Sequence, residues 1–344
     1  MGKDRRPVII TGIIVLLVAV CALLYFTGIL PKFGNSNQSS AEGTTAESWE
    51  DWDDGLKLKI GKKTYLSNDN IKAYLLMGTD HSGNENETDP KKYSGNMADF
   101  LMVAIINKTQ RTYGFLELNR DTMTRVKLID EKGEGDATTK CQLCIAHSYG
   151  GTKEMSAENQ VEAVSYLLGK FPIDGYYEIN MSHIGEINHA VGGVTITMED
   201  DLSNVDPALK KGATVTLSDK QADTYLHVRM NVDDGENTSR MRRQENYLRA
   251  LFAQLGQKAE KDSDAGKKIF TTLQQYSTTN LTGDDIGEIQ DATKSSENLD
   301  IITPDGEKKE GKSLTDGLVH AQFYMDKDSL AECLTKLCNL READ

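Results

Sequence analysis

The chain opens with an apolar segment, since residues 7–30 contain no charged side chain. About 20 such residues in a helix cross a hydrocarbon core of about 30 Å. Lys3, Arg5 and Arg6 precede the segment, and flanking positive charges favour the cytoplasmic side. We therefore expect a cytoplasmic tail (1–6), a transmembrane anchor (7–30) and an extracytoplasmic remainder. A cleaved signal peptide is the alternative, but no small-x-small site follows the run before Pro31.

A polar stretch follows the anchor. Residues 31–55 are rich in Ser, Gly, Thr, Asn and acidic side chains, which give the segment little surface to bury, so we expect a flexible linker. Residues 56–344 contain no internal repeat and no further linker-like stretch. This part of the sequence therefore predicts one large domain.

The domain begins with segments of strand character. Residues 57–67 resemble a hairpin around Gly61 and Lys62. Residues 71–77 and 100–106 are continuous apolar runs of strand length, and 112–118 is a third candidate. Strands that are apolar on both sides are typical of a sheet covered on both faces. The pattern therefore predicts an α/β sandwich, with helices on both faces of a central sheet.

Helical periodicity appears further along the chain. Val161, Val164, Leu167 and Leu168 fall on one helical face that ends at Gly169, and they are more typical of a protein core than of a lipid-facing surface. The sequence also predicts strands at 176–180 and 194–198, with a short helix carrying Ile184 and Ile187 between them and a turn at Gly192-Gly193. Further helices are predicted at 239–258, 264–276, 282–293 and 327–339.

Charge and cysteine content narrow the possible functions. The formal net charge of −14 argues against nonspecific nucleic-acid binding, so we expect no nucleic-acid partner. Cys141 and Cys144 form a C-x-x-C, and Cys333 and Cys338 lie close together. Without a second C-x-x-C or paired histidines they do not form a zinc site, and local disulfides or buried thiols are favoured over a thioredoxin-like redox role, whose flanking pattern Cys141 and Cys144 lack.

Three polar patches carry candidate chemistry. Asp99 precedes a predicted strand, Arg120 and Asp121 follow another, and a third patch contains several arginines. Carboxylates at strand ends can bind Mg²⁺ together with substrate phosphates. The guanidinium fork pairs with phosphate oxygens, and arginines three apart near a helix N-terminus point the same way. The third patch consists of Arg229, Arg240, Arg242, Arg243 and Gln244.

Each patch also has a structural interpretation. Asp99 would cap a loop, Arg120 and Asp121 would form a surface ion pair, and the arginines would form a solvated helical face. The sequence contains no G-x-S-x-G, P-loop or H-E-x-x-H. Composition and spacing alone therefore favour pyrophosphate binding and phosphoryl transfer without deciding between these interpretations.

The order of these segments resembles the LytR-CpsA-Psr family over roughly residues 70–340. Six short motifs of that family have counterparts here in the same order. They are G-x-D in LLMGTD (75–80), S-D in Ala98-Asp99, S-I-P-R-D-T in LELNRDT (116–122), an alanine and Gly-Gly stretch in IAHSYGG (145–151), D-A-x-G-G-V in NHAVGGV (188–194), and R-x-x-R-Q in Arg240, Arg243 and Gln244.

The resemblance implies a fold and an activity. The fold would be a mixed central sheet between helices, with a lipid tunnel beneath it. The activity would move a polyprenyl-pyrophosphate-linked glycopolymer onto a peptidoglycan hydroxyl, forming a phosphodiester, with Mg²⁺ or Mn²⁺ as cofactor. Asp99 and Asp121 would bind metal or organise charge, with Asp121 as the proposed base. The catalytic set would be Asp99, Arg120 and Asp121, and the pyrophosphate would contact Arg120, Arg229, Arg240, Arg243, Gln244 and His227.

Two positions depart from the family pattern. In Y-x-R-x-R the first arginine is replaced by His227, and the aspartate before R-x-x-R-Q is Asn237. A histidine is only partly charged near neutral pH, so the geometry around the head group is in question, and His227 as an ordinary strand side chain stays open. A pyrophosphatase acting on the same donor and a non-catalytic membrane regulator are the alternative functions.

Overall fold

The computed structural model describes residues 55–343 except 81–86, 229–236, 262–271, 283–284, 286–287, 290–291, 293–295 and 313–316. Within these described residues, no helix has both the length and the apolar character needed to cross a membrane. The predicted anchor (7–30) and nearly all of the predicted linker lie outside this part of the chain, so both stay predictions.

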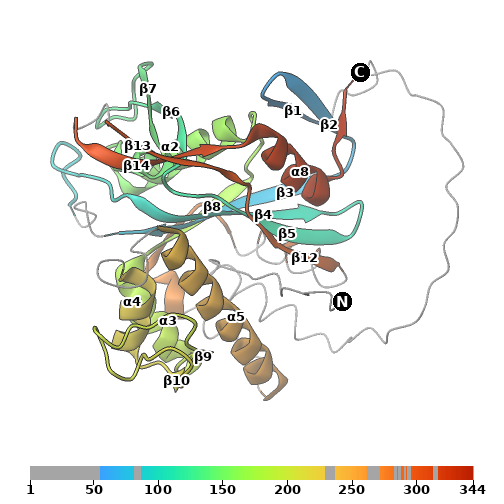
Figure 1. Cartoon of the computed structure of the whole chain (residues 1–344). Coiled ribbons are helices and arrows are strands. Elements are labelled where there is room, and N and C mark those ends of the chain that lie inside the picture. The colour runs from blue at the N-terminus through green and yellow to red at the C-terminus, as the bar shows by residue number, and fades with distance from the viewer. Residues whose placement is uncertain are drawn as a thin grey trace, which may run out of the picture.

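The centre of the fold is a six-stranded mixed sheet (Figure 1). The strand order is β11-β8-β3-β4-β5-β12. β4 pairs antiparallel with both β3 and β5, whereas β8 runs parallel to β3 and β12 parallel to β5. The strands are β3 (Ile71–Thr79), β4 (Ala98–Asn107), β5 (Thr112–Glu117), β8 (Gly175–Asn180), β11 (Ser277–Thr279) and β12 (Glu297–Ile302).

The central strands are buried on both faces. In β3, Tyr74 and Leu76 enter one hydrophobic core, while Leu75 and Met77 enter the other. Successive side chains of a strand point to opposite faces, so a continuous apolar run is needed when both faces are covered. The predicted sandwich is confirmed.

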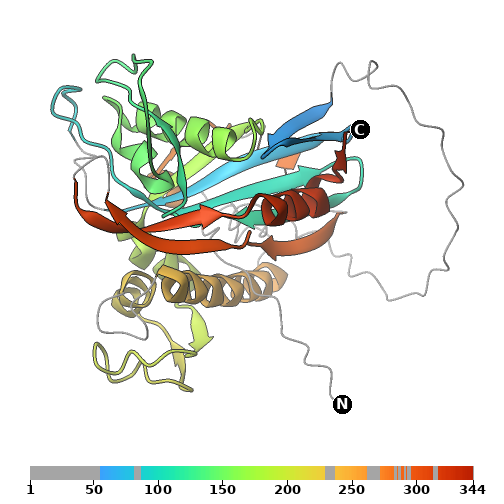
Figure 2. The same ribbon diagram turned by 45° about the horizontal axis from the view of Figure 1, so that its top comes forward.

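One face of the sheet is covered by α2 (Lys153–Leu167) and α8 (Lys327–Cys338), as Figures 1 and 2 show. Both helices begin at a capping residue, because the Thr152 hydroxyl accepts a hydrogen bond from the Met155 N–H and the Asp326 carboxylate accepts two in the same way. Smaller elements on this side are β1 (Leu56–Ile60), β2 (Lys63–Ser67), β15 (Arg341–Glu342), β6 (Met123–Lys127), β7 (Thr138–Gln142), the short helix η2 (Leu143–Ser148), β13 (Gly306–Lys312) and β14 (Val319–Met325).

The opposite face is covered by helices and a small hairpin (Figure 1). The helix α3 ends at Gly192, whose φ of 81° lies in the left-handed region that favours glycine. Tyr247, Leu248 and Leu251 of α5 are fully buried against this core. The elements are the short helix η3 (Met181–His183), α3 (Ile184–Val191), β9 (Thr195–Thr197), β10 (Thr214–Thr216), α4 (Asp219–His227) and α5 (Asn237–Lys261).

Most elements agree with the sequence prediction, and two assignments are wrong. Asp99 lies inside β4 and not before it, because the pairing with β3 extends to Ala98. His227 is the last residue of α4, so it is a helical and not a strand side chain. Among the described residues, Cys141, Cys144, Cys333 and Cys338 are free and buried, which confirms the buried-thiol alternative. The helices predicted at 264–276 and 282–293 lie largely outside the described residues.

Candidate active site

The predicted site residues gather at one end of the central sheet. Thr79 at the end of β3 lies opposite Ala98 at the start of β4, and beside Asn180 at the end of β8. β5 ends nearby, at Glu117, and leads into the segment that carries Arg120 and Asp121. The alternation of strand directions therefore brings segments distant in sequence to the same edge of the sheet.

A buried ion cluster lies at this edge. Asp99 is 9% exposed, and its carboxylate faces two guanidinium groups. Its Oδ1 pairs with Nη1 of Arg120, and its Oδ2 lies 2.6 Å from Nη1 of Arg240. Arg240 also donates to the Asp99 carbonyl oxygen at 3.4 Å. The structure thus brings together one residue from each of the three predicted patches.

A tight turn holds Arg120 and Asp121 in place. The side-chain oxygen of Asn119 accepts a hydrogen bond from the Asp121 N–H at 2.9 Å, and the backbone carbonyl oxygen of Asn119 accepts one from the Thr122 hydroxyl at 2.6 Å. Asn and Asp favour such turns because their side chains bond to the backbone two residues further on. On β7, the Gln142 amide donates to Oδ1 of Asp121 at 3.2 Å. The Asp121 carboxylate is therefore oriented by a neighbouring strand.

The charge of Arg120 is secured by its surroundings. Burial alone would lower the pKa of the guanidinium, but Cys144 and the carboxylates of Asp121 and Asp80 raise it, and the net direction is upward. Nε of Arg120 lies 3.5 Å from Oδ1 of Asp121. Asp80 follows β3 in the G-x-D motif, and the sequence analysis assigned it no role. Its electrostatic influence on Arg120 makes it a further member of the site.

A second arginine group lies on the same inward side of α5. Arg240 and Arg243 are both 2% exposed, as their spacing near the helix N-terminus predicts, but they contact different partners. Arg243 donates to the carbonyl oxygens of Tyr225 and Val228, and its Nη1 lies 3.4 Å from Asp200. Within the described residues the Arg243 guanidinium therefore joins α5 to α4, and it does not enter the Asp99 cluster.

The remaining predicted contacts are more peripheral. Gln244 donates to the Leu226 carbonyl oxygen at 3.5 Å, and its buried Oε1 has no hydrogen-bond partner among the described residues. Nδ1 of His227 lies 2.9 Å from the Asp223 carbonyl oxygen and 3.0 Å from Oδ1 of the same residue. Arg229 lies outside the described residues. The binding roles of Gln244, His227 and Arg229 stay predictions.

A buried histidine behind the site was missed by the sequence analysis. Nε2 of His147 lies 2.9 Å from Oε2 of Glu178, and its Nδ1 lies 2.9 Å from the Asn96 carbonyl oxygen. Burial lowers the pKa of His147, but Glu178 raises it more strongly together with that backbone contact, so the pKa is raised. Asn96 precedes Met97, whose sulfur contacts Arg120. The pair therefore supports the backbone beneath the site, and its signal was the histidine in IAHSYGG.

The carboxylates of Asp99 and Asp121 differ in how well they fit a divalent cation. Both oxygens of Asp99 already face arginines, which suits a charge organiser better than a metal ligand. Oδ1 of Asp121 accepts a hydrogen bond, and no hydrogen bond within the described residues occupies its Oδ2. No group of three or more His, Cys, Asp or Glu side chains suited to hold a metal occurs in the described part of the chain. Mg²⁺ commonly uses one or two carboxylates and completes its coordination with water and substrate phosphates, so Asp121 fits that role.

The site gathers arginines and aspartates at one end of the central sheet, and comparison with known proteins identifies the family of the chain. The model of the LytR_cpsA_psr family matches residues 33–339, and the chain belongs to this family.

Individual relatives are distant. The chain is 27% identical over 281 residues to the polyisoprenyl-teichoic acid–peptidoglycan teichoic acid transferase TagU of Bacillus cereus (strain AH820), a match that covers 80% of each chain. It is 24% identical over 251 residues to biofilm regulatory protein A of Streptococcus mutans, which covers 69% of this chain and 56% of that protein. The crystal structure of protein gbs0355 from Streptococcus agalactiae covers 78% of this chain and 88% of its own, with 23% identity and a TM-score of 0.59, and it shows the same fold.

Proposed function

We propose that the chain is a phosphotransferase that moves an anionic glycopolymer from a polyprenyl-pyrophosphate carrier onto a hydroxyl of peptidoglycan. The observation that carries the proposal is the buried cluster of Asp99, Arg120 and Arg240 at the end of the sheet. Membership of the family and the likeness to a relative named as a teichoic acid transferase support it.

The arginines are suited to bind the pyrophosphate. A guanidinium has five N–H donors in a fixed plane, and the Asp99 carboxylate pairs with one terminal nitrogen of Arg120 and one of Arg240. Because Asp99 holds both side chains before substrate arrives, little reorganisation is needed when the anion binds. Such preorganised charge is the main contribution of a protein to phosphoryl transfer.

The reaction follows from this arrangement. The acceptor hydroxyl attacks the phosphorus that carries the glycan, and a new oxygen–phosphorus bond forms. The bond from that phosphorus to the bridging oxygen breaks, and polyprenyl phosphate leaves with the electron pair. Asp121, whose position is fixed by Gln142 and Asn119, would take the hydroxyl proton, and Arg120 and Arg240 would stabilise the charge on the phosphate oxygens.

Charge balance favours a divalent cation. Asp80, Asp99 and Asp121 surround two arginines of the described residues, so this part of the site has no positive excess for an incoming pyrophosphate. Mg²⁺ or Mn²⁺ bound to Asp121 and the phosphates would supply positive charge to the leaving group. Arg229 would add to it from the segment outside the described residues.

The test is a transfer assay with the purified full chain. A synthetic polyprenyl-pyrophosphoryl oligosaccharide, peptidoglycan fragments and Mg²⁺ are incubated together, and the products are identified by mass spectrometry. We expect a phosphodiester-linked glycan and free polyprenyl phosphate. Arg240→Ala should lower the rate on the order of 10²–10³-fold, the effect of removing one charge-stabilising donor.

The matched control is Arg242→Ala on the same helix. Arg242 pairs with Asp200 and is 40% exposed, so its loss should leave turnover nearly unchanged. Released glycan phosphate without coupling to peptidoglycan would identify a pyrophosphatase instead. A donor that binds but stays intact would identify a non-catalytic regulator, and either result would exclude the transferase.

We also propose that residues 7–30 anchor the chain in the cell membrane, with residues 56–344 outside the cytoplasm. The proposal rests on the uncharged apolar run behind Lys3, Arg5 and Arg6. Without protease, the chain should sediment with the membranes of lysed cells. Protease added to intact cells should degrade residues 56–344. Protection of the domain from the protease would contradict this topology.

A further inference from the structure

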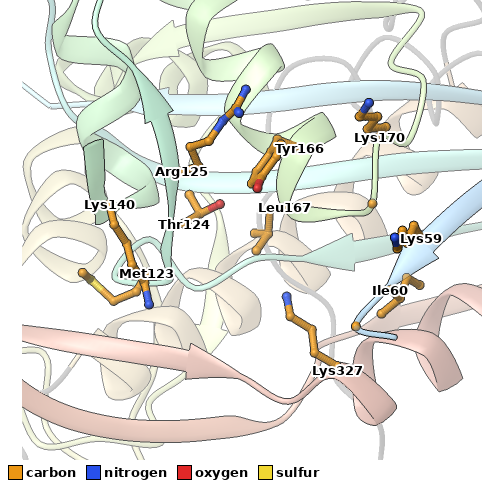
Figure 3. Close-up of a pocket in the computed structure, with 12 residues that line it drawn as sticks. Lys59, Ile60, Met123, Thr124, Arg125, Lys140, Tyr166, Leu167, Lys170 and Lys327 are labelled. Atoms are coloured by element: carbon orange, nitrogen blue, oxygen red, sulfur yellow. The ribbon is translucent and has the colours of Figure 1, made fainter. Parts of the chain in front are cut away.

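A cavity on the α2 face of the sheet, apart from the candidate active site, is lined by positive side chains (Figure 3). Its volume is about 460 Å³. It lies between the β6–β7 hairpin, the β1–β2 turn, the end of α2 and the start of α8. Five of its residues carry positive charge, and none carries negative charge: Lys59, Arg125, Lys140, Lys170 and Lys327.

This concentration of cations is unusual for the chain. Asp and Glu number 53 against 39 Lys and Arg, so a random surface would place carboxylates among them. Elsewhere lysines have acidic partners, such as Lys72 with Asp174 and Lys63 with Glu342. Within the described residues, none of the five cations of the cavity forms an ion pair with a carboxylate. A hollow lined in this way favours an anionic ligand.

The side chains are arranged to leave donors available. The guanidinium of Arg125 lies over the Tyr166 ring, 4.4 Å from its centroid, and a contact with a ring face uses none of the five N–H donors as a hydrogen bond to an oxygen. Lys140 and Lys327 approach from opposite walls (Figure 3). Partial burial and the charge of Lys140 lower the pKa of Lys327, as expected where positive charges converge without a counter-ion.

The cavity connects to the catalytic edge through the β6–β7 hairpin. Met123 pairs with Gln142, the residue that donates to Asp121, and two positions further along Arg125 pairs with Lys140. Directly paired residues share one face of a hairpin, and so do residues two apart. At about 3.3 Å per residue, Arg125 lies roughly 13 Å along the chain from Asp121. One face of the hairpin therefore leads from the catalytic carboxylate to the cations.

We propose that this cavity binds phosphate groups of the glycopolymer chain while its pyrophosphate end occupies the Arg120 and Arg240 cluster. The proposal rests on the proposed function, because it takes the polymer to be the donor. Phosphates repeated along a flexible chain match cations contributed by several elements. Binding there would hold the polymer along the hairpin and keep the reacting phosphorus in place.

The test measures binding without turnover. Isothermal titration calorimetry is performed on the full chain in detergent micelles, with a synthetic glycerol phosphate oligomer that carries neither lipid nor pyrophosphate. We expect salt-sensitive binding, weakened about tenfold by Lys140→Ala, because losing a hydrogen bond to a charged group typically costs a factor of this size. Arg125→Ala should act similarly, and circular dichroism checks that each variant is folded.

Lys127→Ala is the matched control. Lys127 lies on the same strand and the same face as Arg125, but it pairs with Glu162 and does not line the cavity. Its removal should leave oligomer affinity unchanged. Equal affinity of wild type and Lys140→Ala would overturn the proposal.

Two further ligands separate the sources of phosphate. If inorganic phosphate competes as strongly per molecule as the oligomer, the cavity is a single-phosphate site and polymer binding is refuted. If Lys140→Ala weakens binding to phosphatidylglycerol vesicles but not to the oligomer, the ligand is the membrane surface, and the proposal also fails. Oligomer binding through Lys140 in a chain without transfer activity would support the cavity and refute the proposed function alone.

Discussion

Glu117 provides the sharpest test of the electrostatics near the site. It is the last residue of β5, three positions before Arg120, and it is 5% exposed. The Thr303 hydroxyl donates to its Oε2 at 3.1 Å, while its buried Oε1 has no hydrogen-bond partner within the described residues. Burial, and to a smaller extent the charge of Glu245, raise the pKa of Glu117 to about 8. The carboxyl group is therefore largely protonated at neutral pH.

This pKa has a consequence for stability. Because the folded state binds the proton more tightly, the stabilisation is fully present below the ordinary value of 4.5 and is lost as pH rises toward 8. Each tenfold change in proton affinity corresponds to about 1.4 kcal/mol, so complete ionisation of Glu117 would cost roughly 5 kcal/mol. Structural relaxation and water entry would reduce this, and we expect about 3–5 kcal/mol.

The perturbation is Glu117→Gln, which keeps an acceptor for Thr303 and removes the titration. Urea unfolding followed by circular dichroism gives the free energy of unfolding of both proteins from pH 5 to pH 9. We expect similar stability near pH 5, an advantage of the variant that grows as pH rises from 5 to about 8, and a nearly constant difference above that. Glu245→Gln serves as a comparison, because burial raises the pKa of Glu245 to about 7 and it titrates in the same range. Parallel pH profiles of wild type and Glu117→Gln would refute the reasoning.

Three further predictions concern the region behind the site. His147→Gln should destabilise the protein most below about pH 6.5, and the difference should shrink as pH rises, because the raised pKa of His147 links its stabilising charge to low pH; a pH-independent difference in urea unfolding would contradict this. Gly95→Ala should cost about 1–3 kcal/mol, because a Cβ would lie 2.1 Å from the His147 carbonyl oxygen, and an unchanged melting temperature would exclude that clash. Burial raises the pKa of Cys144 to about 11, so in the native protein this thiol should react with iodoacetamide at least about 100-fold more slowly than cysteine in solution. Equal rates before and after unfolding in urea would show that the thiol is accessible in the native state.

The fold was predictable where the hydrophobic pattern has one physical cause. The centres of β3 (73–77) and β4 (100–106) are continuously apolar because both faces are covered, and α8 shows its helical period and its capping Asp326 in the sequence. The boundary at Asp99 was not predictable, because a polar residue inside a strand end resembles a loop residue until its partner strand is known. His227 lies in a helix and not in a strand, because Ser218 and Gln221 form a capping box that starts the helix α4 nine residues earlier. That capping box is a signal in the sequence that the prediction did not use.

The site was predictable as a set of residues and less so as a set of contacts. Spacing indicated that Arg240 and Arg243 share a helical side, and both are buried there. It could not show that Arg243 turns to the carbonyl oxygens of α4, because those acceptors come from residues far apart in sequence. The support from Glu178 to His147 and the cations around Lys140 were missed for the same reason, since each depends on segments joined only by folding.

The arrangement of charges explains why one carboxylate is placed between two arginines. Two unpaired guanidinium groups buried side by side would repel each other and lose hydration, which is costly in a weakly polar interior. Asp99 removes that cost by pairing its carboxylate with both Arg120 and Arg240, so the positive groups stay charged and oriented while substrate is absent. The same carboxylate, with Asp80 and Asp121, cancels the positive excess that a pyrophosphate would otherwise meet. If the proposed function holds, binding must draw on charge that arrives with the substrate or from outside this cluster, and the proposed divalent cation and the proposed phosphate site around Lys140 would supply it in complementary ways.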